Sequence, residues 1–128
     1  YRSDMYAKRE EEHGWMLDLY RHWNVDDANS REFLARRYIE RVIGCVENVT
    51  SKSCTLSSAE KRAEIKRIIS DEKVQALLPV MRPQSSYMKL MLIPVKMQSA
   101  FLTYLEGCFI SKVKSGNVKL FASLKAKR

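Results

Sequence analysis

The sequence lacks the motifs that mark the commonest catalytic and metal sites. It has no glycine-rich phosphate loop, no Gly-x-Ser-x-Gly nucleophile turn, no His-Glu-x-x-His and no Cys-x-x-Cys. Its three cysteines, Cys45, Cys54 and Cys108, are odd in number and widely spaced, which is typical of unpaired thiols in a reducing cytosol. We therefore expect no catalytic residue, no metal site and no cofactor within these 128 residues.

One adjacent pair of acidic residues, Asp26 and Asp27, could be considered as metal ligands. The pair lies in an expected turn just before a helix, where acidic side chains are favoured by capping and by the helix dipole. We therefore interpret Asp26 and Asp27 as helix-starting residues.

Residues that interrupt helices are also scarce. Only four glycines and three prolines occur in 128 residues, and Glu, Lys, Arg, Leu and Ala are plentiful. The composition predicts an all-α fold, and the length suits a single compact domain. Because the chain opens on Tyr1 and is charged from Arg2 onward, we expect it to be the C-terminal piece of a longer polypeptide.

The first two predicted helices cover residues 4–23 and about 30–49, and together they make up most of residues 1–55. In the first, five apolar residues fall along one side at helical spacing: Met5, Met16, Leu19, Tyr20 and Trp23. In the second, a broad apolar stripe includes Leu34, Tyr38, Val42, Cys45 and Val49, and Asn29 with Glu32 resembles a capping box. We expect this second helix to be central and well packed.

Residues 56–128 predict three or four further helices. Ser57 and Glu60 form a capping box, and a short helix follows Ser70 and ends before Pro79. A long apolar helix then starts at Ser85 or Ser86 and passes Pro94, where we expect a kink or a break because proline has no N–H. We predict a compact bundle of about five to six helices, with the last long helix kinked near Pro94.

Acidic residues and long apolar runs are both missing from the last third of the chain. Residues 85–128 hold eight Lys and Arg against Glu106 alone, whereas residues 1–84 hold 15 against 14 acidic residues. Apolar runs there are too short for a transmembrane helix, because lysines divide them. Residues 118–128 can form an amphipathic helix typical of a membrane interface or of a docked basic helix. We expect contact with a membrane or another anionic partner at Lys112, Lys114, Lys119, Phe121, Leu124, Lys125, Lys127 and Arg128.

The order of motifs after residue 56 resembles a known family. A Ser-Ser-Ala-Glu cap, then Ile-Ile-Ser-Asp-Glu-Lys-Val, Pro83 and Ser-Ser-Tyr-Met-Lys-Leu-Met-Leu-Ile-Pro-Val-Lys precede an aromatic helix and a lysine-rich end. This succession resembles the C-terminal helical region of bacterial family 2 glycosyltransferases, which are inverting enzymes of the GT-A type. The resemblance covers residues 56–128 best and is weaker over residues 1–55.

The resemblance implies a parent enzyme that moves a sugar from a nucleotide donor to a capsular, exopolysaccharide or lipopolysaccharide glycan. Nucleotide-sugar and divalent metal would bind only in an upstream catalytic domain, which would be this segment's partner. The segment itself would serve stability, assembly or attachment to the inner membrane face of a cytoplasmic enzyme. Two alternatives stay open: a basic helical nucleic-acid-binding module, disfavoured by the near-neutral residues 1–84, and a generic protein-interaction bundle, including a homo-oligomer.

Overall fold

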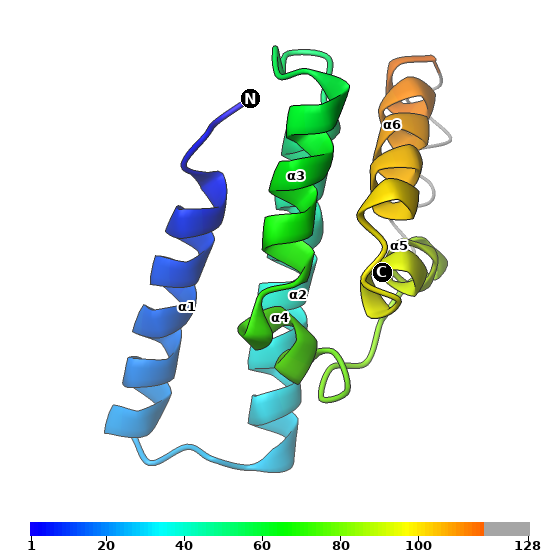
Figure 1. Ribbon diagram of the computed structural model, residues 1–128. Coiled ribbons are helices and arrows are strands. Elements are labelled where there is room, and N and C mark those ends of the chain that lie inside the picture. The colour runs from blue at the N-terminus through cyan, green and yellow to red at the C-terminus, as the bar shows by residue number, and fades with distance from the viewer. Residues whose placement is uncertain (117–128) are drawn as a thin grey trace.

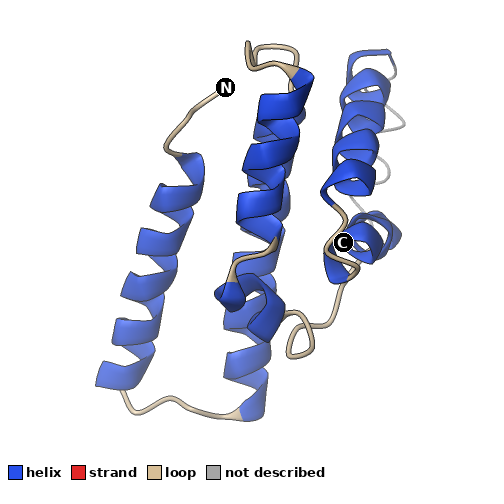
Figure 2. Cartoon of the chain, in the orientation of Figure 1, coloured by secondary structure: helices blue, strands red, loops and turns tan. Residues whose placement is uncertain are grey.

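The computed structural model describes residues 1–116, with side chains through Val113, and this part of the chain consists of helices and loops (Figures 1 and 2). The predicted all-α fold and number of helices are confirmed. The helices described are α1 (Met5–His22), α2 (Ala28–Thr50), α3 (Ser58–Ile69), α4 (Glu72–Leu77), α5 (Ser86–Lys96) and α6 (Ala100–Gly116).

Helix α2 is the centre of the molecule, as its apolar stripe predicts. It packs against α1, α3, α4 and α6, and its residues on three sides are almost inaccessible to solvent. Each fully buried aliphatic side chain contributes about 1.5–3 kcal/mol relative to its exposed state. The largest of its buried side chains are Tyr38, Ile39, Val42, Ile43 and Val46.

The helices form three layers around α2. Figure 1 shows α1 on one side of the α2–α3 pair, and α5 with α6 on the opposite side. Helix α6 packs against both α2 and α3, whereas α1 contacts mainly α2. The faces of α1 and α6 that point away from the centre therefore have no neighbouring helix among the described residues.

Polar side chains cap the helices, and two of the predicted caps need correction. The capping box of Ser57 and Glu60 is present in both directions. For α2, the cap is Asp27 rather than Asn29, and its carboxylate accepts from the backbone N–H of Ser30 at 3.2 Å. The helix thus begins two residues earlier than predicted, because Asp27 in an extended conformation can reach that N–H.

Helices α4 and α5 are also capped by a side-chain oxygen that accepts a hydrogen bond from a backbone N–H of the first turn. Asp71 caps α4 by accepting from the Lys73 N–H at 2.9 Å, one residue beyond the expected Ser70. Ser85 caps α5 by accepting from the Met88 N–H at 3.0 Å, and the helix begins at Ser86, one of the two predicted starting positions.

The expected kink of the last long helix near Pro94 is not confirmed. Helix α5 continues through Pro94 to Lys96, and the break comes at residues 97–99, where Gln98 has a φ of 54°. Proline removes one donor, but its carbonyl still accepts from the Ser99 N–H at 3.0 Å. The stretch is therefore two helices, separated by a left-handed residue after the proline.

Helix α1 is attached to the bundle by few side chains. Tyr6 is its only buried residue, and the Tyr38 hydroxyl donates to the Tyr6 hydroxyl at 3.1 Å. The Arg67 guanidinium lies 5.5 Å from the Tyr6 ring centre. Burial raises the pKa of Tyr6 well above its ordinary value, so the hydroxyl remains protonated. Of the predicted apolar stripe, Leu19 and Trp23 are exposed.

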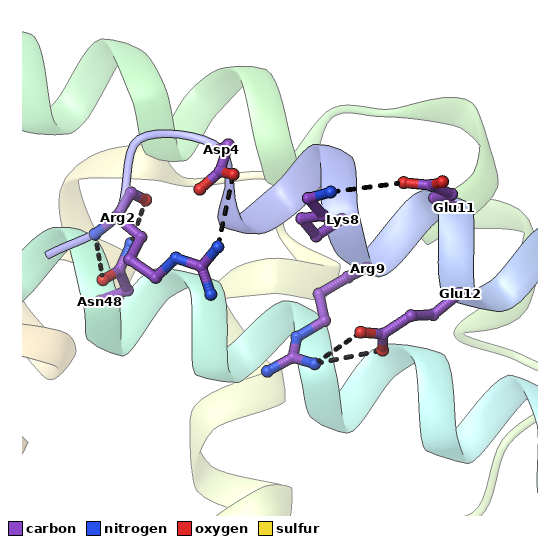
Figure 3. A network of polar contacts seen from close by, with 7 residues as sticks. All are labelled: Arg2, Asp4, Lys8, Arg9, Glu11, Glu12 and Asn48. Atoms are coloured by element: carbon purple, nitrogen blue, oxygen red, sulfur yellow. Dashed lines mark hydrogen bonds and ion pairs between the residues drawn. The ribbon is translucent and has the colours of Figure 1, made fainter.

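The segment before α1 is held by Asn48 of α2 (Figure 3). The Asn48 side-chain oxygen accepts from the Arg2 N–H at 3.0 Å, and its nitrogen donates to the Arg2 carbonyl at 2.8 Å. Asn48 and the buried Thr50 also form a glycosylation sequon with Val49. In the folded chain both of these side chains have structural roles.

The first prediction concerns the close approach of α6 to α2 at Gly107 and Thr50. A Cβ added at Gly107 would lie 2.7 Å from both Cγ2 and Oγ1 of the buried Thr50, whose hydroxyl donates to the Val46 carbonyl. The overpacking cost of about 1–3 kcal/mol exceeds the helix-propensity gain of about 1 kcal/mol. Gly107→Ala should therefore lower the free energy of unfolding by up to about 2 kcal/mol, measured by urea denaturation.

A matched control exists in α2. A Cβ added at Gly44 meets nothing within 4 Å, so Gly44→Ala should stabilise the protein by about 0.5–1 kcal/mol. Stabilisation by both substitutions would show that α6 does not approach α2 as described.

Candidate functional site

Helix α6 turns its smallest side chains toward the core. Thr103, Gly107 and Ile110 are buried against the bundle, and the Thr103 hydroxyl donates back to the Ser99 carbonyl at 2.8 Å. The hydroxyl is thereby satisfied without a partner from another helix, and the absence of a side chain at Gly107 lets α6 lie close to Thr50. The phenylalanines of α6, Phe101 and Phe109, are exposed on the other side of the helix.

The projecting residues of α5 and α6 are large and apolar. Phe101, Leu105 and Phe109 follow one another at i, i+4 and i+8, and they are 55%, 45% and 63% exposed. Seven of the fifteen exposed large hydrophobic residues found in residues 1–113 fall between positions 90 and 109. We call this set the α5–α6 outer surface: Leu90, Ile93, Met97, Phe101, Leu102, Leu105 and Phe109.

Lysines accompany the α5–α6 outer surface. Lys89 and Lys96 of α5 and Lys112 of α6 are exposed, and Glu106 is the one acidic residue between positions 85 and 116. No ion pair joins these lysines to an acidic side chain within the described part of the chain. Their positive charge is therefore available to an anionic partner.

The carboxyl group of Glu106 is partly buried at the edge of this surface. Its Oε2 atom is buried and has no hydrogen-bond partner among the described residues, and burial raises the pKa of the Glu106 carboxyl. The raised pKa means that partial burial disfavours the charged carboxylate of Glu106 relative to its state in the unfolded chain.

The structure locates two of the predicted contact residues but tests none of the predicted contacts. Lys112 is exposed next to the α5–α6 outer surface, and Lys114 belongs to α6. The other predicted contacts lie outside the described residues: Lys119, Phe121, Leu124, Lys125, Lys127 and Arg128. The prediction at those six positions stays a prediction.

Groups that could suggest catalysis have structural explanations. Asp27 is the cap of α2, and the carboxylate of Asp26 pairs with Arg31 at 2.9 Å. Cys45 is a free thiol in the core, and burial raises its pKa to about 12, so it is not a thiolate at neutral pH.

Comparison of the chain with family models, curated proteins and solved structures finds no match. Within residues 1–116, no helix is both long enough and apolar enough to cross a membrane.

The outward orientation of the α5–α6 outer surface was missed by the sequence reasoning. The apolar spacing of Phe101, Leu105 and Phe109 resembles that of any core-facing stripe. A usable signal was the pair Thr103 and Gly107, because small residues at helical spacing permit close helix contact. The larger stripe was then the one left exposed.

The burial of Glu106 generates the second prediction. Because its pKa is raised in the folded state, the folded chain holds more protons than the unfolded chain above pH 4.5, and stability falls as pH rises there. Glu106→Gln removes the buried charge, so it should raise the free energy of unfolding at pH 7 by up to about 1 kcal/mol. The gain should disappear below pH 4.5, as measured by urea denaturation at both pH values.

Glu11→Gln is the control, because Glu11 is exposed on α1 and pairs only loosely with Lys8 at 3.9 Å. An equal stabilisation by Glu106→Gln at pH 7 and pH 4 would contradict the assignment of a buried charge.

Proposed function

We propose that this chain is a non-catalytic helical module that attaches to an anionic membrane surface through the α5–α6 outer surface and the basic residues that follow it. The observation that carries the proposal is the concentration of exposed large apolar side chains in α5 and α6 beside three exposed lysines, Lys89, Lys96 and Lys112. Soluble monomeric proteins rarely expose contiguous apolar patches of several hundred Å², and such patches commonly mark interaction sites.

The chemistry of this surface suits a lipid interface. Phenylalanine and leucine side chains gain about 25 cal/mol for each Å² of apolar area removed from water, and each lysine near an anionic leaflet adds about 1 kcal/mol. The lysine stems can lie along the acyl boundary while their ammonium groups reach the head groups. The module would therefore lie on the membrane rather than span it.

We further propose that the parent chain is a cytoplasmic glycosyltransferase and that the module holds its catalytic domain at the inner membrane face. The support is the resemblance of residues 56–128 to the helical region of family 2 enzymes. A glycan acceptor linked to lipid lies at the membrane, so attachment raises the local concentration of acceptor around the enzyme.

The membrane proposal predicts binding that depends on lipid charge. The chain should sediment with vesicles of phosphatidylcholine and phosphatidylglycerol at 7:3, and remain in the supernatant with phosphatidylcholine alone. Phe101→Ala combined with Phe109→Ala should weaken binding at least tenfold, because two exposed aromatic anchors are lost. Removal of residues 117–128 should weaken binding further.

Phe33→Ala is the matched control, since Phe33 is 40% exposed on α2 and lies outside the α5–α6 outer surface. Equal recovery in the supernatant with both lipid compositions would overturn the membrane proposal. Salt-sensitive binding to DNA or RNA without binding to vesicles would support the nucleic-acid alternative instead.

The transferase proposal has a separate test. The residues encoded upstream of Tyr1 should form a strand-rich sugar-nucleotide domain that contains an Asp-x-Asp motif. An unrelated upstream sequence would remove the transferase proposal and leave the membrane proposal untouched.

A further inference from the structure

A second candidate site lies on the opposite side of the molecule, between α1 and α2. A cavity of about 220 Å³ opens there between the middle of α1 and the middle of α2. Its apolar wall consists of Trp15 and Met16 from α1 and of Leu34 and Tyr38 from α2. Sites for drug-sized ligands measure about 300–1,000 Å³, so this cavity suits a group no larger than about one ring.

Arginines from both helices line the same cavity. Arg37 and Arg41 are one turn apart on α2, and Arg9 faces them from α1. Glu12 is the only acidic residue in the lining, and its carboxylate pairs with Arg9 at 3.1 Å and with Arg41 at 3.5 Å. Figure 3 shows both carboxylate oxygens of Glu12 directed at Arg9.

The ion pairs of Glu12 leave other guanidinium N–H donors of the cavity without a hydrogen-bond partner among the described residues. Arg37 is exposed and has no hydrogen bond or ion pair within the described part of the chain. The Nε atom of Arg9 is buried and is likewise without a partner there. Since three guanidinium groups are balanced by one carboxylate, the lining carries an excess of positive charge.

His13 adds an aromatic surface rather than another cation. Its ring lies 4.5 Å from the Tyr38 ring, centre to centre. Burial and the nearby Lys73 lower the pKa of His13, so the ring is neutral at pH 7. The positive charge of the cavity therefore comes from the arginines, which remain charged at all relevant pH values.

We propose that this cavity binds a small organic anion, namely a ring-sized apolar body that carries a carboxylate or a phosphate group. The ring would lie against Trp15, Met16 and Leu34, and the anionic group would accept hydrogen bonds from Arg37 and its neighbours. Guanidinium groups bind both anions through two parallel hydrogen bonds, which supplies orientation as well as attraction. This site is independent of the membrane-binding proposal, because it lies on the far side of α2.

The two tryptophans of the chain give a direct readout. Trp15 lines the cavity and Trp23 does not, so in the Trp23→Phe variant all tryptophan emission comes from the cavity wall. Titration of this variant with 3-phenylpropionate and with phenyl phosphate should change the emission saturably, with a Kd on the order of 1 mM for so small a ligand. The stronger of the two identifies whether carboxylate or phosphate is preferred.

Two comparisons make the result decisive. The neutral 3-phenylpropanamide should bind at least tenfold more weakly than 3-phenylpropionate, because it lacks the charge. Arg37→Gln should weaken binding of the anion at least fivefold, whereas Arg62→Gln, the same change on the exposed face of α3, should leave it unchanged. Equal binding of amide and acid, loss of binding in both arginine variants alike, or no saturable response to either anion would overturn the proposal.

Discussion

The close contact between α6 and α2 at Gly107 and Thr50 is the constraint on which the arrangement of the C-terminal half depends. A helix that lies this near its neighbour must present small side chains at the contact, and α6 does so with Thr103 and Gly107. The rotation of α6 about its own axis is thereby fixed, and its phenylalanines are turned outward. The same contact that completes the core thus creates the exposed apolar surface proposed to bind lipid.

Helix α2 contacts four of the other helices: α1, α3, α4 and α6. It is flanked by α1 on one side and by α3 and α6 on the others, and α3 makes a further contact with α6. Different parts of α2 have different roles. The C-terminal end is enclosed by the bundle and holds Thr50 and Asn48 in structural roles, whereas the middle carries two arginines of the α1–α2 cavity.

Much of the fold could be predicted from the sequence where the signal is local or dense. The stripe of α2 was recognisable because a helix buried on several sides carries more apolar residues than one face requires. The cap of α3 was recognisable because Ser57 and Glu60 form a capping box within four residues. The break was predicted at Pro94 but lies after it, because it depends on the positive φ of Gln98. Positive φ is usually predicted from a glycine, and this position has none. The cavity could not be foreseen, since its arginines come from two helices whose relative placement is a tertiary property.

Because α1 has only one buried residue, we expect this helix to detach from the bundle at a lower free energy than global unfolding requires. Tyr6 is the one buried residue of α1, with Met5 packed against the same core and a few ion pairs beside it, whereas α2, α3 and α5 each contribute several buried residues. Amide hydrogens of α1 can therefore exchange through local detachment of that helix, at a free-energy cost below that of global unfolding. A ligand in the α1–α2 cavity would bind only the attached form, so it would couple occupancy to the order of the N-terminal helix.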